Sequence, residues 1–115
     1  MNPLDEREKA FEAKFHVDEE LRFKANARKD KLLGLWVAEQ IGLTGEAAQE
    51  YARSVVALDL DDSRHEAMIK KLLADLSQHQ VKIGAAEIAV QMDRLTHVAR
   101  QQIASEAGEG KHTLA

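Results

Sequence analysis

Apolar residues recur at helical spacing along almost the whole chain, and the pattern is interrupted at only three places. The first segment runs from about Asp5 to Ile41 without a break, and it is followed by Gly42 at a position where helices commonly end. No segment shows the alternation of a strand, and the chain contains one proline. The sequence therefore predicts an all-α domain.

Three shorter helices are expected after Gly42. Thr44 can cap the first of them, which ends where aspartates gather at residues 59–62, and Ser63 with Glu66 forms a capping box for the next. Gly84 separates that helix from the last one. The apolar positions expected to face the core of these helices are Ala48, Tyr51, Ala52, Val55, Leu58, Ile69, Leu72, Leu73, Leu76, Ile88, Met92, Leu95, Ala99 and Ile103.

Short connections between amphipathic helices favour antiparallel neighbours, which indicates a small four-helix bundle over residues 20–107. The last eight residues, 108–115, contain two glycines and are expected to form a disordered tail. Gly34 lies inside the first helix, where glycine costs about 1 kcal/mol relative to alanine. We expect a neighbouring helix to approach closely there, with Trp36 packed alongside.

The first helix is too long for the others to cover. At 1.5 Å per residue it would extend about 55 Å, against about 25–36 Å for the other three helices. Its second half is rich in apolar residues and can be covered, so residues 1–19 are expected to overhang as a mobile arm that is continuous with the helix. An isolated helix as short as this arm is only marginally stable in water.

The arm nevertheless carries two phenylalanines, Phe11 and Phe15, one helical turn apart. One interpretation is that the arm becomes helical when a partner covers this pair. The other interpretation is that Phe11 and Phe15 fold back onto the bundle. Counted through Lys31, the charges cancel, with eight acidic and eight basic residues, which suits a protein groove better than a membrane surface.

Composition excludes several classes of function. There is no cysteine, and the net charge of −4 leaves no basic footprint for nucleic acid. The charged N-terminus does not resemble a signal peptide, and no stretch is apolar enough for membrane insertion, so a cytoplasmic protein is expected. The histidines are scattered without metal-site spacing, and the acidic pairs have no apolar surroundings, so neither a metal site nor an enzyme is expected.

A basic side of the first helix leaves one alternative open. Arg22, Lys24, Arg28, Lys29 and Lys31 form the strongest charge cluster in the sequence. They are either an ordinary solvated face or a surface for anionic side chains or nucleotide phosphates. Arg28 and Lys29 are the candidate residues for binding ATP or ADP. No other cofactor is expected.

The stretches DEREKAFEAKF, DEELRFKANARKDKLLGLW and AEQIGLTGEAAQEYARSVV resemble the zeta subunit of alphaproteobacterial F-type ATP synthases. The resemblance is continuous from about Asp5 to Val56 and looser from Ser63 to Ala107. It implies a four-helix bundle whose N-terminal arm inserts as a helix into a catalytic α/β interface of the synthase head. There the arm would reach towards the γ subunit of the rotor and block rotation in the hydrolytic direction.

By this resemblance the protein is an inhibitor of ATP hydrolysis and is held at the inner face of the cell membrane through the synthase. Phe11 and Phe15 would anchor the arm, and the neighbouring charges would set its register. The residues expected to contact the synthase are Asp5, Glu6, Arg7, Glu8, Lys9, Phe11, Lys14, Phe15, Arg22 and Phe23. The alternatives are a helical module that senses ATP or ADP, and a helical adaptor for another protein.

Overall fold

The computed structural model describes residues 19–60 and 64–114, and within these ranges the chain forms helices and no strands. The helices are α2 (Glu19–Gln40), α3 (Gly45–Asp59), α4 (Glu66–Gln78) and α5 (Ala85–Leu114). Side chains are described as far as residue 107. The predicted all-α bundle is confirmed. The expected arm, residues 1–19, lies outside the described residues except for Glu19, the first residue of α2.

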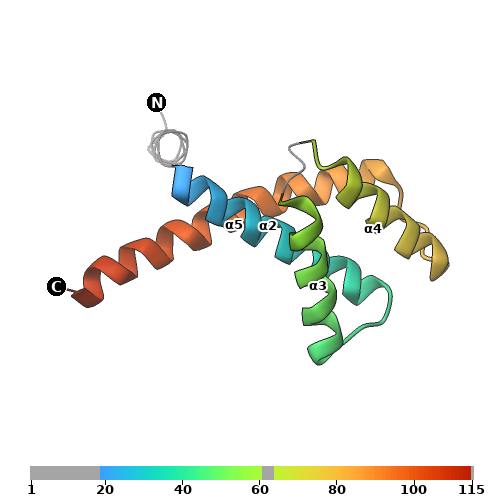
Figure 1. Cartoon of the computed structure of the whole chain (residues 1–115), viewed down its shortest axis with the longest axis horizontal. Helices are drawn as coiled ribbons and strands as arrows, with labels where there is room; N and C mark the ends of the chain where they lie inside the picture. Colours follow the sequence, from blue (N-terminus) through green and yellow to red (C-terminus); the bar gives the residue numbers. More distant parts are fainter. Residues whose placement is uncertain (1–18, 61–63, 115) are drawn as a thin grey trace.

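Helix α2 is the centre of the arrangement. It packs most extensively against α3 and α5, whereas α4 has fewer contacts with each of the other helices. The chain directions of α2 and α5 are opposed, and the C-terminal end of α5 projects past the start of α2 (Figure 1). Helix α3 crosses α2 at a steep angle, and its N-terminal end projects away from the α2–α5 pair (Figure 1). The start of α2 is therefore covered on one side by α5 and remains open beside α3.

The steep crossing of α2 and α3 depends on Gly34. A Cβ atom built on Gly34 would lie 2.8 Å from the Cα atom of Ala52 and 3.3 Å from the Cβ atoms of Ala52 and Val55. No side chain fits between the two backbones. The predicted close approach is confirmed, and the neighbour is α3. Trp36 packs against the main core cluster, as expected.

The helices begin and end close to the residues that the sequence predicted, and two of the capping interactions differ. Gly42 adopts a left-handed φ of 85° and closes α2 with a Schellman motif, in which Leu43 N–H donates to Ala38 and Gly42 N–H to Glu39. Thr44 is the N-cap of α3, but its side chain makes no capping hydrogen bond. The N-cap of α4 is His65 rather than Ser63, which lies outside the described residues.

The main apolar core has members in all the helices of the described chain. Its buried members are Leu33, Val37, Val55, Met68, Leu72, Leu76, Ile88 and Leu95, and a smaller cluster of Ala25 and Ile103 extends it along α2 and α5. A polar contact adds to the packing of α3 on α4, because Tyr51 Oη donates a 2.7 Å hydrogen bond to Asp75. Burial, with this hydrogen bond, raises the pKa of Tyr51.

Two expectations about the helices are wrong. Leu58 is 40% exposed, because the inward position at the end of α3 is taken by its neighbour Asp59. Helix α5 continues to Leu114, through the segment expected to be a disordered tail. Gly108 and Gly110 lower helix propensity by about 1 kcal/mol each, but neither glycine obliges a helix to end.

Substituting Gly34 with alanine should destabilise the protein, although alanine is the better helix former. The gain in propensity is about 1 kcal/mol, whereas forcing α3 away from α2 costs about 1–3 kcal/mol. Thermal unfolding of Gly34→Ala should therefore show a lower Tm than wild type. Gly84→Ala is the control, because nothing lies within 4 Å of the added Cβ. Equal or higher stability of Gly34→Ala would contradict the close-approach interpretation.

Candidate functional site

Most residues expected to contact a partner belong to the arm and lie outside the described residues; these are Asp5, Glu6, Arg7, Glu8, Lys9, Phe11, Lys14 and Phe15. Arg22 and Phe23 lie in the first turns of α2, and both are exposed. Phe23 exposes 60% of its surface, which is unusual for a phenylalanine in a small bundle. Phe23 is therefore part of the protein surface and not of the core.

Phe23 lies at one side of a groove formed by α2, α3 and the distal part of α5. The groove has a volume of about 660 Å³, and we call it the basic groove. Its lining residues are Phe23, Lys24, Ala27, Arg28, Lys31, Gln49, Arg53, Val56, Ala57, Leu60, Ile103 and Glu106. Half of these side chains are apolar, and four of the others are basic against one acidic. The groove thus combines an apolar lining with a positive rim.

The charged side chains at the rim of the groove differ in the partners that they bind. Arg28 donates hydrogen bonds to Gln102 (2.8 Å) and Glu106 (2.9 Å), so it holds α2 against α5. Lys24 forms an exposed ion pair with Glu20, and Arg53 forms one with Glu46. Exposed pairs of this kind contribute about 0–1 kcal/mol and exchange readily. Lys24 and Arg53 can therefore turn to an anionic group in the groove at little cost.

A second polar feature is buried where α2 meets the connection between α3 and α4. We call it the buried cluster, and its members are Lys29, Asp30, Asp59 and His65. Lys29 and Asp30 are 3% and 4% exposed, and Lys29 Nζ lies 3.1 Å from Asp30 Oδ1, although in a direction that makes no hydrogen bond to that oxygen. Nδ1 of His65 lies 2.7 and 2.8 Å from the two oxygens of Asp59. The cluster thus fastens the end of α3 and the start of α4 to α2.

The buried cluster holds one proton more readily than isolated groups would. Burial raises the pKa of Asp30 to about 7, and its hydrogen bond to Asp59 and the negative charge of Asp59 act in the same direction. Lys29 opposes this effect. One ammonium group and two carboxylates leave a net charge of −1 in the interior when His65 is neutral. A single proton therefore makes the cluster neutral.

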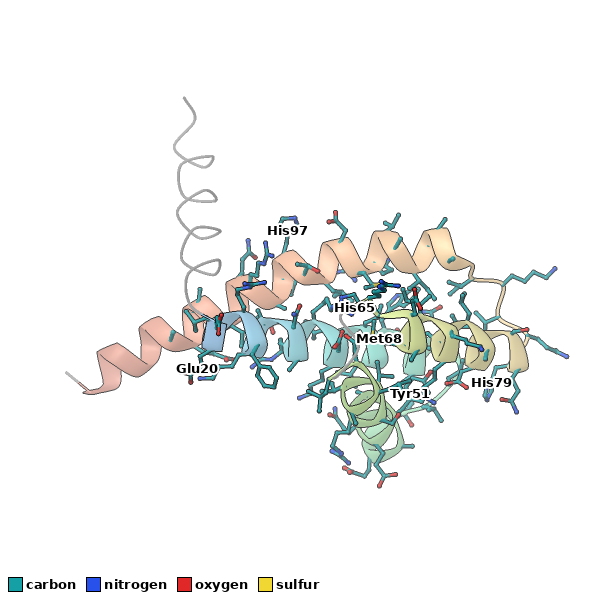
Figure 2. All side chains as sticks on the ribbon, turned by 45° about the horizontal axis from the view of Figure 1, so that its top comes forward. Glu20, Tyr51, His65, Met68, His79 and His97 are labelled. Carbon is teal, nitrogen blue, oxygen red and sulfur yellow. The ribbon has the colours of Figure 1, made fainter. Side chains whose placement is uncertain are left out.

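Asp30, Asp59 and His65 also offer ligand atoms within 4.8 Å of one another, which is close enough to consider a metal ion. The ammonium group of Lys29 already lies against Asp30, so the cluster has its own cation. Figure 2 shows the other labelled histidines, His79 and His97, well apart from His65 and from each other. The expectation that this protein has no metal site stays a prediction.

The structure separates the two residues that the sequence grouped as a nucleotide site. Arg28 lines the basic groove, whereas Lys29 is buried and paired with Asp30. The basic side of α2 is therefore not a single solvated face. The burial of Lys29 could have been predicted from sequence spacing. The buried residues of this face follow one another at intervals of four, and they are Ala25, Lys29, Leu33 and Val37.

Comparisons with known proteins address the identity of the chain. The family described as ATPase inhibitor subunit zeta matches residues 1–102. The chain belongs to this family. The match includes the arm and all but the last part of α5. A zeta subunit is named as an inhibitor rather than an enzyme, and the family implies an association with the ATP synthase.

A solved structure agrees with the fold of this zeta protein. It is a solution NMR structure with 40% sequence identity and a TM-score of 0.66, covering 75% of this chain and 98% of that chain. No protein with a curated description matches the sequence. Within residues 19–60 and 64–114, no helix is long and apolar enough to cross a membrane.

The raised pKa of Asp30 predicts how the stability of this zeta subunit depends on pH. The folded state binds the proton more tightly than the unfolded state, so this group's contribution to stability falls as the pH rises from about 4 to about 7. Asp30→Asn should flatten this part of the profile, because the amide stays neutral. Urea unfolding measured across this range tests the expectation.

Asp93→Asn is the matched control, since Asp93 is exposed on α5 and should keep the wild-type slope. The interpretation of the buried cluster would be wrong if Asp30→Asn and wild type lost stability equally between pH 4 and pH 7.

Proposed function

We propose that this zeta subunit inhibits ATP hydrolysis by inserting its N-terminal arm, as a helix, into a catalytic α/β interface of the synthase head. The observation that carries the proposal is the family match over residues 1–102, which includes the whole arm. The inserted arm reaches the γ subunit and blocks rotation in the hydrolytic direction. The protein acts at the inner face of the cell membrane, where it is held by the synthase.

The described part of the molecule supports separate roles for the arm, which inhibits, and for the bundle, which holds it. Helix α2 begins at Glu19, directly after the arm, and runs through the centre of the bundle. Helix formation by the arm can therefore propagate from a turn that is already folded, which removes the nucleation cost of an isolated helix. The bundle then serves as a stop that limits how far the arm enters the interface.

Binding energy is assigned chiefly to the phenylalanines. In a helix, Phe11 and Phe15 share one face, and Phe23 on α2 continues the apolar surface two turns further on. Aromatic side chains that enter desolvated pockets commonly dominate an interface. Arg7, Lys9, Lys14 and the acidic residues between them fix register through charge pairing with the cleft.

Deletion of residues 1–18 should abolish inhibition, because it removes the arm and leaves α2 complete. Phe11→Ala alone should weaken inhibition by roughly 30-fold, the effect of losing about 2 kcal/mol at an interface hot spot. ATP hydrolysis by the cognate synthase, titrated with each variant, gives both answers. Val90→Ala is the control, because Val90 is an exposed apolar residue of α5 and does not belong to the arm.

Circular dichroism of the truncated protein should retain the helical signal and the unfolding transition of the bundle. Inhibition by the truncated protein equal to that of the full chain would refute the assignment of the arm as effector.

Nucleotide binding is a second candidate function, and the positive rim of the basic groove favours it. The residues that could hold phosphates there are Lys24, Arg28, Lys31 and Arg53, whereas Lys29 is excluded by its burial. Calorimetric titration with ATP or ADP should then give a one-to-one isotherm. Arg53→Glu should abolish the isotherm and Arg94→Glu, on the exposed side of α5, should not. An absence of heat with wild type would dismiss this candidate.

A further inference from the structure

The basic groove is a surface without an occupant in the described part of the chain. Its walls come from three helices, and Phe23, Val56 and Leu60 leave apolar surface open to solvent. Phe23 and Leu60 are 60% and 54% exposed, which places two large apolar side chains at one opening. Such a surface, surrounded by charge, is typical of a binding site for a chain segment of matching character.

We propose that the basic groove is the docking site for the chain's own residues 4–15, which bind it as a helix antiparallel to the start of α2. In this docked state Phe11 and Phe15 are covered by the groove and are withheld from the synthase. The inference deepens the proposed function, and only its consequence for inhibition rests on that function.

The point of attachment makes this occupant sterically accessible. Phe15 lies four positions before Glu19, the first residue of α2, and an extended chain spans about 14 Å over those four steps. Phe23 lies one turn into α2, only about 6 Å along the helix from Glu19. A turn at residues 16–18 therefore returns Phe15 to the side of Phe23. Loops of this length commonly join antiparallel helices.

An antiparallel register brings matching side chains together. With Phe15 beside Phe23, Phe11 comes beside Ala27, a small residue that leaves space for an aromatic ring. In a helix, Leu4 falls on the same face as the two phenylalanines, and Glu8 and Glu12 flank that face. The apolar face of the arm thus meets the apolar lining of the groove.

Charge favours the same occupant. Residues 4–15 contain the acidic residues Asp5, Glu6, Glu8 and Glu12 against the basic residues Arg7, Lys9 and Lys14. The groove has the opposite balance, with Lys24, Arg28, Lys31 and Arg53 against Glu106. In the antiparallel register Glu8 approaches Lys31 and Glu12 approaches Lys24. These pairs lie at the rim, where they set register more than they add affinity.

Paramagnetic relaxation in the full-length protein tests the docking directly. The chain has no cysteine, so Ala13→Cys gives a unique attachment point for a nitroxide on the helix side opposite Phe11. The methyl groups of Val56, Leu60 and Ile103 should broaden selectively. Those of Val81 and Ile83 should not, because they follow His79 at the far end of the molecule from Glu20 (Figure 2).

Two sets of substitutions should remove the broadening without unfolding the bundle. One set is Phe11→Ser with Phe15→Ser, in the arm. The other is Lys31→Glu with Arg53→Glu, two exposed residues of the groove. Arg94→Glu is the matched control for the charge change and should leave the broadening intact. Absence of selective broadening in the wild-type chain would overturn the proposal, whether or not the protein inhibits the synthase.

Inhibition assays test the consequence separately. If about nine-tenths of the arms are docked, freeing them should tighten apparent inhibition about tenfold. Lys31→Glu with Arg53→Glu should therefore inhibit ATP hydrolysis more strongly than wild type. Weaker inhibition by this variant would mean that the groove binds the synthase, and would overturn competition by the arm. Broadening in a wild-type protein that does not inhibit would support docking and refute the proposed function.

Discussion

The contact between Gly34 and Ala52 determines the relation of the other helices to α2. Because a bare backbone in α2 meets the backbone of α3, the two helices approach more closely than side chains would permit. The leucines and valines around this point are then buried completely, and they form the main core cluster with α4 and α5. The same crossing directs α3 away from the first turns of α2. The basic groove exists because that divergence leaves space beside Phe23, Ala27 and Lys31.

The buried cluster complements this apolar contact nearer the start of α2. Its four charged or titratable groups come from α2, from the last residue of α3 and from the N-cap of α4. Apolar packing alone specifies the orientation of a helix poorly. Each member of the buried cluster, in contrast, has a particular partner within hydrogen-bonding or ion-pairing distance. His65 is held in a left-handed conformation, with φ of 62°, at the residue that starts α4. The cluster therefore fixes where α4 begins as well as how α3 ends.

The helices and most of their ends could be predicted from the sequence because local signals specify them. Gly42 ends α2, Gly84 precedes α5, and Gly34 marks the close approach of a neighbour. Burial of Lys29 and Asp30 was missed because charged residues were assigned to the surface by type, although their spacing places them on the buried face. The steep direction of α3 could not be predicted, since it depends on side-chain packing between residues distant in sequence. The groove was missed for the same reason. The proposed role of the arm came from family resemblance, as periodicity predicted only that residues 1–19 extend beyond the other helices.

The central position of α2 has a mechanical consequence. A force applied along the axis of α2 acts on its contacts with α3 and α5 in shear, so many side chains resist it at once. A force applied across the axis at Glu19 would instead open the contacts one after another, beginning with the small Ala25–Ile103 cluster. The molecule is thus stiff to compression along α2 and compliant to bending at its start. A partner that pulls sideways on the start of α2 would therefore meet less resistance than one that pushes along the axis of α2.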